Sequence, residues 1–258
     1  MTEFDGLHVL VTGAASGIGA ALVDSLVRKR ARVTAIDQNA AGLDRLLARL
    51  DAPGQLLTRA LDVSDSTAIT DVVNAAEATL GPIARLACVA GVLQMGRIVE
   101  LTDEQWKRTF DVNTFGVFNV CRAVATRMIE RRRGAIVTVS SNAATTPRAA
   151  MGAYAASKAA VTQLTRCLAL ELAEYGIRCN IVSPGSTDTE MQRAMWRDGT
   201  SREAVIDGHA PSYRLGIPLR KIATPDDVVS AILFLLSDRA GHITLHDLRV
   251  DGGATLDQ

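Results

Sequence analysis

The sequence of 258 residues has few aromatic side chains and no excess of either charge. Phe, Trp and Tyr make up only 4% of the residues, whereas 48% are hydrophobic, so we expect a large core of aliphatic side chains. Basic and acidic residues both number 28, and this balance gives no electrostatic reason to expect a nucleic acid or a membrane as partner. Composition therefore favours one large α/β domain.

Cysteines are also scarce, and none of the four forms a Cys-x-x-Cys pair. Cys88, Cys121, Cys167 and Cys179 all lie in apolar segments, where we expect buried, reduced thiols. The four histidines have no convincing ligand spacing, so no metal site is expected. Neither a signal peptide nor an apolar run long enough to span a bilayer is present, and we expect a cytoplasmic protein.

Short apolar runs alternate with helical patterns along the chain. The expected strands are 7–12, 32–36, 55–61, 85–89, 135–140, 177–182 and 248–251. The expected helices are 18–30, 43–50, 65–80, 102–129, 154–172 and 225–237. This alternation predicts one Rossmann-type domain over residues 1–258, a doubly wound parallel sheet of about seven strands with helices on both faces. Residues 184–221 break the alternation and are predicted to form a substrate-binding loop.

A glycine-rich turn follows the first expected strand and opens the first helix. Its residues predicted to bind a cofactor are Gly13, Ser16, Gly17, Ile18 and Gly19. Glycines there let the backbone turn tightly, and the free N–H groups of the helix favour a pyrophosphate. The turn therefore predicts a dinucleotide site.

Two acidic positions bear on the choice of dinucleotide. Asp37 directly follows the second strand, where a carboxylate binds ribose hydroxyls and repels a 2′-phosphate. No basic residue between Gly13 and Gly17 offsets that repulsion, so the sequence predicts NAD rather than NADP. Asp62 and Val63 follow the third strand and are predicted to contact the adenine.

Tyr154 and Lys158 are four residues apart, so on a helix both side chains lie on one face. An ammonium beside a phenol favours the phenolate, and we expect Lys158 to lower the pKa of Tyr154. That would make the tyrosine usable as a general base. Ser141 ends an apolar run and is predicted to hold a substrate oxygen opposite the tyrosine.

The glycine-rich turn together with Asn113, Ser141, Tyr154 and Lys158 resembles the short-chain dehydrogenase/reductase family over essentially the whole chain. The resemblance implies that the serine orients the substrate oxygen and that the tyrosine is the acid/base. It implies that the lysine lowers the pKa of the tyrosine and binds the nicotinamide ribose, and that Asn113 anchors a water for proton relay. A homotetramer is implied as well.

The resemblance extends to the loops expected beside the nicotinamide. It implies cofactor contacts for Ala90, Gly91, Pro184, Gly185, Thr187 and Thr189. One departure is that the family's Asn-Asn-Ala-Gly after the fourth strand is replaced by the sequence 88–91, Cys-Val-Ala-Gly. The missing asparagines leave open how the sheet and the neighbouring helix are hydrogen-bonded here.

Several loop segments resemble a narrower group of the same family. They are 91–96, 146–151, 183–192, 215–219 and 241–244. The group oxidises a carboxylated cyclohexadiene diol during the synthesis of catechol siderophores, so the resemblance implies that substrate. A carboxylated substrate calls for a cation, and Arg148 is the candidate, with Met151, Met191 and Gln192 facing the ring.

The sequence leaves alternatives open. Arg148 is equally compatible with a solvent-facing loop arginine, and the methionines with plain packing. A separate alternative is another short-chain dehydrogenase, acting on a different cyclic alcohol, a steroid or a 3-oxoacyl thioester, which the matches in the substrate loops disfavour. A protein that senses NAD without turnover is a further alternative, which the complete set of acid/base residues disfavours.

Overall fold

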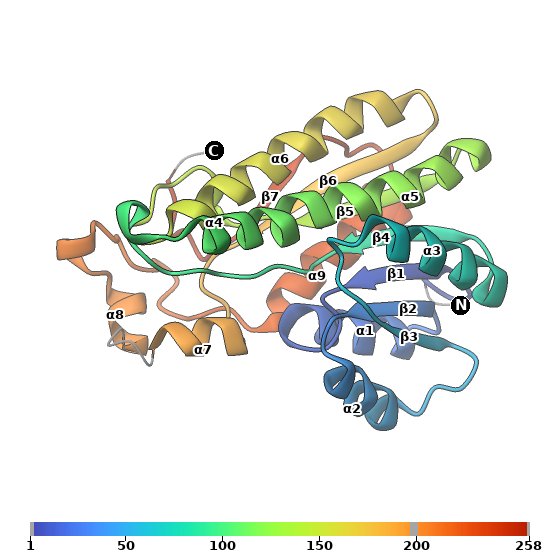
Figure 1. Cartoon of the computed structure of the whole chain (residues 1–258), viewed down its shortest axis with the longest axis horizontal. Coiled ribbons are helices and arrows are strands. Elements are labelled where there is room, and N and C mark those ends of the chain that lie inside the picture. The colour runs from blue at the N-terminus through green and yellow to red at the C-terminus, as the bar shows by residue number, and fades with distance from the viewer. Residues whose placement is uncertain (1–2, 197–200, 257–258) are drawn as a thin grey trace.

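The computed structural model describes residues 3–196 and 201–256, and its centre is a parallel sheet of seven strands (Figure 1). The strands are β1 (His8–Thr12), β2 (Arg32–Asp37), β3 (Leu56–Ala60), β4 (Ile83–Cys88), β5 (Gly134–Val139), β6 (Ile177–Pro184) and β7 (Asp247–Val250). Their order is β3-β2-β1-β4-β5-β6-β7. The seven predicted strands are confirmed, with ends that differ by at most two residues.

Helices cover both faces of the sheet, as predicted. One face packs against α1 (Gly17–Arg28), α2 (Ala40–Leu50) and α9 (Pro225–Leu236). The other packs against α3 (Ser66–Leu80), α5 (Gly116–Arg131) and α6 (Gly152–Ala173). The largest fully buried side chains are nearly all Leu, Ile or Met, which agrees with the low aromatic content. No described helix combines the length and the apolar character needed to cross a membrane.

The cysteines follow the prediction at three positions of four. Cys88, Cys121 and Cys179 are buried, and the sulfur atoms of the first two lie 3.8 Å apart as free thiols. Cys167 is exposed, so the prediction was wrong there. Its place on α6 is on the solvent side, where the Gln163 amide contacts its sulfur at 3.9 Å.

Buried hydroxyl pairs fix α6 on the sheet. The hydroxyls of Thr138 on β5 and Thr165 on α6 lie 2.8 Å apart. The Ser140 hydroxyl, just after β5, donates to the Lys158 carbonyl at 3.1 Å and lies 2.6 Å from the Thr162 hydroxyl. These residues are all buried, so sliding of the helix would leave polar groups without partners. The register of α6 on β5 is therefore set by hydrogen bonds as well as by packing.

The long helix predicted over 102–129 is divided in three. It begins as α4 (Asp103–Phe110), widens into a π-helical turn at Asp111–Phe115 and continues as α5. Such wide turns concentrate at functional sites. Asn113 lies in this turn.

The segment 184–221 is more regular than predicted. It contains α7 (Glu190–Trp196) and α8 (Arg202–Asp207), which lie together at one end of the molecule (Figure 1). Helices of seven and six residues are too short to show a helical period in the sequence. Asp188 N–H donates to the Ala223 carbonyl at 2.8 Å and closes the base of the segment. Residues 197–200 of the predicted loop lie outside the described residues.

Candidate functional site

Two adjoining cavities open where the carboxyl ends of the strands meet. The order of the sheet reverses between β1 and β4, the place where open α/β sheets bind ligands. We call the first the glycine cavity, which Gly13–Gly19, Asp37 and Asp62 help to line. The second is the tyrosine cavity, which Ser141, Tyr154 and Lys158 help to line. Ile18, Val89, Gly91, Thr189 and Met191 line both.

The predicted cofactor residues all lie on the walls of these cavities. In the glycine cavity are Gly13, Ser16, Gly17, Ile18, Gly19, Asp37, Asp62, Val63, Ala90 and Gly91. In the tyrosine cavity are Pro184, Gly185, Thr187, Tyr154 and Lys158, with Thr189 shared. Segments far apart in the chain thus meet in one continuous space.

The glycine-rich turn needs its glycines and leaves a helix end open. Gly13 has φ +69°, and a Cβ there would lie 2.7 Å from the Ala90 Cα. A Cβ on Gly19 would lie 2.0 Å from the Gly13 carbonyl oxygen. The Ser16 side chain does not cap α1, and the first turn holds no acid, whereas Asp65 and Thr102 cap α3 and α4. The open N–H groups of α1 fit the pyrophosphate of a dinucleotide.

The Asp37 carboxylate is held at the mouth of this turn. One oxygen accepts the Ala15 N–H at 3.0 Å and the other the Asn39 N–H at 2.9 Å. Each oxygen keeps a lone pair for a ribose hydroxyl, and the negative charge repels a 2′-phosphate. The cavity therefore fits NAD better than NADP, as predicted.

Asp62 is tied to a cation that the sequence analysis did not identify. The Arg108 guanidinium donates to Asp62 at 2.7 Å and to the Gln38 amide oxygen at 2.9 Å, and all three residues line the glycine cavity. Burial raises the pKa of Asp62, but hydrogen bonds from Ser64 and Arg108 outweigh it and hold that pKa below its ordinary value. The two Arg108 hydrogen bonds join α4 to the segments that follow β2 and β3. Only the fold brings these residues together.

A threonine anchors the loop after β4 to the sheet. The Thr12 hydroxyl accepts the N–H groups of Val89 at 3.1 Å and of Ala90 at 3.2 Å. These contacts tie the end of β1 to the loop between β4 and the glycine cavity. The neighbouring helical segment holds the same loop through Asn113, whose Oδ1 accepts the Val92 N–H at 2.8 Å.

Tyr154 and Ser141 meet across the tyrosine cavity, joined by a hydrogen bond. Burial raises the pKa of Tyr154, and the hydrogen bond from Ser141 offsets this only in part. The prediction that Lys158 lowers this pKa was wrong for the chain without ligands. The Lys158 Nζ atom lies 5.8 Å from the centre of the tyrosine ring, and it donates to the Val139 carbonyl at 2.8 Å.

Lys158 is itself strongly affected by its surroundings. Its side chain is 4% exposed, and burial lowers its pKa to about 8. A Cβ on Gly91 would lie 3.3 Å both from the Lys158 Nζ and from the Asn113 Oδ1. Glycine at position 91 therefore leaves room for the ammonium beside the cofactor loop.

Asn113 connects the loop after β4 to α6. Its Oδ1 accepts the Val92 N–H at 2.8 Å, and its Nδ2 donates to the Val92 carbonyl at 2.9 Å and to the Ser157 hydroxyl at 3.0 Å. The side chain does not line either cavity. It holds the surrounding backbone in place, and its role in a water relay stays a prediction.

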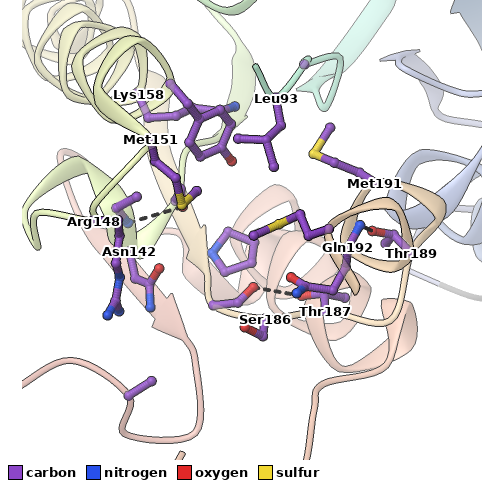
Figure 2. Close-up of a pocket in the computed structure, with 18 of the residues that line it drawn as sticks. Leu93, Asn142, Arg148, Met151, Lys158, Ser186, Thr187, Thr189, Met191 and Gln192 are labelled. Atoms are coloured by element: carbon purple, nitrogen blue, oxygen red, sulfur yellow. Dashed lines mark hydrogen bonds between the residues drawn. The ribbon is translucent and has the colours of Figure 1, made fainter. Parts of the chain in front are cut away.

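The four residues proposed for the substrate all line the tyrosine cavity. Arg148, Met151, Met191 and Gln192 surround it from opposite sides (Figure 2). The buried Nε2 of Gln192 has no acceptor among the described residues. The wall thus offers an unused amide donor beside two flexible thioethers.

A second arginine of this cavity escaped the sequence analysis. Arg214 lines it from the loop after α8 and is half-buried. Within residues 3–196 and 201–256, its side chain forms no hydrogen bond or ion pair, and burial lowers its pKa. Its place could not be predicted, because no strand or helix pattern orients the loop that carries it.

Comparison with known proteins agrees with this geometry. A family model described as short chain dehydrogenase matches residues 7–199. The 2,3-dihydro-2,3-dihydroxybenzoate dehydrogenase of Bacillus subtilis (strain 168) is 51% identical over 253 residues, 98% of this chain and 97% of the relative. The vibriobactin-specific 2,3-dihydro-2,3-dihydroxybenzoate dehydrogenase of Vibrio cholerae serotype O1 is 47% identical over 96% of both chains. The structure of levodione reductase has a TM-score of 0.90 at 27% identity, covering 97% of this chain and 98% of that one.

Replacing Asp37 tests the choice of dinucleotide. Asp37→Ser should weaken NADH binding roughly tenfold, because charge-assisted hydrogen bonds are lost. It should reduce the preference for NADH over NADPH about 100-fold, because a like-charge repulsion is removed. Fluorescence titration with both nucleotides measures this. The exposed Asp44→Ser on α2 is the matched control, and a preference unchanged in the Asp37 variant would contradict the assignment.

Replacing Lys158 tests the cost of its burial. The pKa of Lys158 is about 8 in the folded chain, against an ordinary 10.5, so the folded chain binds fewer protons between these values. The free energy of unfolding of the wild type should therefore rise above pH 8, by up to about 1.4 kcal/mol per pH unit. Lys158→Met should lack this rise and be at least as stable as the wild type at pH 7.

Urea titrations from pH 7 to 9.5 measure the difference, with the exposed Lys107→Met as control. Parallel pH profiles for the wild type and Lys158→Met would show that burial of the ammonium carries no cost.

Proposed function

This chain belongs to the short-chain dehydrogenase family, and from that premise we propose that it oxidises 2,3-dihydro-2,3-dihydroxybenzoate to 2,3-dihydroxybenzoate with NAD, in catechol siderophore biosynthesis. The observation that carries the proposal is the tyrosine cavity, which combines a phenol for proton transfer, two arginines for an acid and walls shared with the glycine cavity. The two dihydrodiol dehydrogenases that match nearly the whole chain support it.

Ser141 and Tyr154 act on the reacting hydroxyl. The Ser141 hydroxyl orients the substrate oxygen, and the phenolate oxygen of Tyr154 accepts its proton as the carbon loses hydride. The hydrogen bond between these two residues places both groups within reach of one oxygen. Lys158 supports them from behind the tyrosine ring, with its pKa of about 8, and binds the nicotinamide ribose.

The cofactor completes the chemistry of the cavity. Bound NAD+ supplies a hydride acceptor and a positive ring charge, which lowers the pKa of a phenol held nearby. In the structure, burial raises the pKa of Tyr154, and the Ser141 hydrogen bond opposes that rise. The loss of hydride and proton turns the C3 alcohol into a ketone, and its tautomerisation gives the aromatic catechol, so the oxidation is effectively one-way.

The remaining wall of the cavity receives the ring. Met151 and Met191 pack against its apolar faces, and the Gln192 amide donates to one of its oxygens. Arg148 adds a positive charge on the Asn142 side of the cavity (Figure 2). These contacts distinguish a small carboxylated ring from a steroid or a 3-oxoacyl thioester.

We also propose that the chain forms one catalytic domain and assembles as a homotetramer in the cytoplasm. Large apolar side chains lie exposed just before α4, on α4 and on α6, among them Val99, Trp106 and Leu170 at 90%, 41% and 66%. Their burial against other copies supports the assembly. Unbonded thiols of Cys88 and Cys121 support a reducing compartment. Light scattering of the full chain should give four times the mass of 27.4 kDa, and a monomer or dimer would contradict it.

The decisive assay mixes the protein with NAD+ and trans-2,3-dihydro-2,3-dihydroxybenzoate. NADH absorbance and the fluorescence of the product should rise together. Turnover of a simple cyclic alcohol but not of this diol would contradict the proposal and indicate a short-chain dehydrogenase with another substrate. NADH binding without turnover of any alcohol would indicate a sensor.

Tyr154→Phe separates catalysis from binding in the same assay. Turnover should fall roughly 10²- to 10⁴-fold, the usual contribution of a positioned acid/base. NADH binding, measured by fluorescence, should stay within twofold of the wild type. A variant that retains most of its turnover would remove Tyr154 from the role of base.

A further inference from the structure

We propose that Arg214 is the residue that pairs with the carboxylate of the substrate, and so determines specificity for an acid over an uncharged ring. The inference rests on the proposed function, because it assigns one substrate group to one side chain. It differs from the expectation drawn from the sequence, in which Arg148 was the only candidate cation.

The first argument is that the Arg214 charge has no counterpart among the residues that the structure describes. The guanidinium is half-buried in the tyrosine cavity, and no described residue accepts a hydrogen bond from it. A half-buried cation without a partner raises the free energy of the folded chain. The five N–H donors of a guanidinium suit the two oxygens of a carboxylate, so a carboxylate ligand would relieve that cost.

The second argument is that the backbone turns Arg214 toward the cavity, while its two neighbours in the chain face solvent. Its neighbours Tyr213 and Leu215 are 92% and 70% exposed. Arg214 and His209 exchange two backbone hydrogen bonds, of 2.9 and 3.1 Å, which close a tight loop. The loop therefore presents one charged side chain inward from a fixed base.

Two glycines make that base possible. Gly208 and Gly216 have φ of +91° and +86°, and their segments touch. A Cβ on Gly208 would lie 2.6 Å from the Arg214 carbonyl oxygen, and one on Gly216 equally close to the Ile206 carbonyl oxygen. The Ile217 N–H also donates to Ile206, at 2.8 Å. Arg214 is thus held by a built loop, as a ligand-binding residue requires.

The third argument is the contrast with Arg148. Arg148 already has an interaction within the chain. In Figure 2 its side chain extends toward the Asn142 side of the cavity, away from Leu93 and Met191. Binding a carboxylate would compete with its existing contact, whereas Arg214 has no side-chain partner to give up within residues 3–196 and 201–256. Arg148 therefore contributes positive charge nearby, and Arg214 forms the ion pair.

The buried Gln192 amide supports an orientation of the substrate with its carboxylate on Arg214. Its Nε2 lies in the wall of this cavity without an acceptor among the residues described. A substrate that places its carboxylate on Arg214 and its reacting hydroxyl between Ser141 and Tyr154 leaves further oxygens to accept from this amide. One bound acid would then satisfy both unpartnered groups.

The test compares two substrates in one variant. With Arg214→Gln, the KM for 2,3-dihydro-2,3-dihydroxybenzoate should rise roughly 10- to 100-fold, the range for a lost charge-assisted pair. The KM for trans-3,5-cyclohexadiene-1,2-diol, the same ring diol without the carboxylate, should stay within about twofold of the wild type. Arg214→Lys keeps the charge but loses the planar fork. Its KM for the acid should lie between those of the wild type and Arg214→Gln.

Stability and binding measurements exclude a merely structural role. The thermal midpoint of Arg214→Gln should equal or exceed that of the wild type, because an unpaired half-buried charge is removed, and NADH binding should not change. Binding of 2,3-dihydroxybenzoate should weaken, while binding of catechol should not. Arg202→Gln, an exposed arginine on α8, makes the same charge change outside the cavity and should behave as the wild type.

The outcomes are distinguishable. If the wild type does not oxidise the dihydrodiol acid, the proposed function fails. If it does, but Arg214→Gln changes the KM for both substrates equally or for neither, the assignment of Arg214 fails while the proposed function stands. If Arg148→Gln shows the selective loss instead, the carboxylate belongs to Arg148. Should Arg214→Gln not fold, Arg214→Lys carries the same comparison, and equal KM changes for acid and diol would overturn the inference.

Discussion

The packing of α6 on β5 is the contact on which the site depends. Tyr154 lies on the helix and Ser141 follows the strand, so their hydrogen bond exists only in one register of the two elements. That register is fixed by buried hydroxyls, of which the pair of Thr138 and Thr165 is one. The Lys158 ammonium adds its own bond to the carbonyl of Val139. Helix, strand and catalytic geometry are therefore one hydrogen-bonded unit.

Burial moves the two titratable groups of this unit in opposite directions. It raises the pKa of Tyr154 and lowers that of Lys158, because both charged forms are poorly solvated there. Burial at the site therefore favours a neutral phenol and weakens the hold of the lysine on its proton.

Local patterns in the sequence were enough to predict the strands, the glycine-rich turn and Asp37. Apolar runs and the place of a residue after a strand are properties of short segments, and parallel strands bring their carboxyl ends together. The partners of Arg108 and the position of Arg214 depend on contacts between distant segments, so they could not be predicted. The pKa of Tyr154 was misjudged because spacing on a helix says nothing about burial or about the Val139 carbonyl that binds the lysine.

The wall shared by the two cavities has a consequence for inhibition. Thr189 and Met191 help to line both spaces, so the two cavities adjoin. A single compound that links a nicotinamide-like head to a carboxylated aromatic ring would address both cavities at once. Once one end of the compound is bound, the short linker would set the effective concentration of the other end at the second cavity. Selectivity against relatives that bind uncharged rings would then come from its acid group.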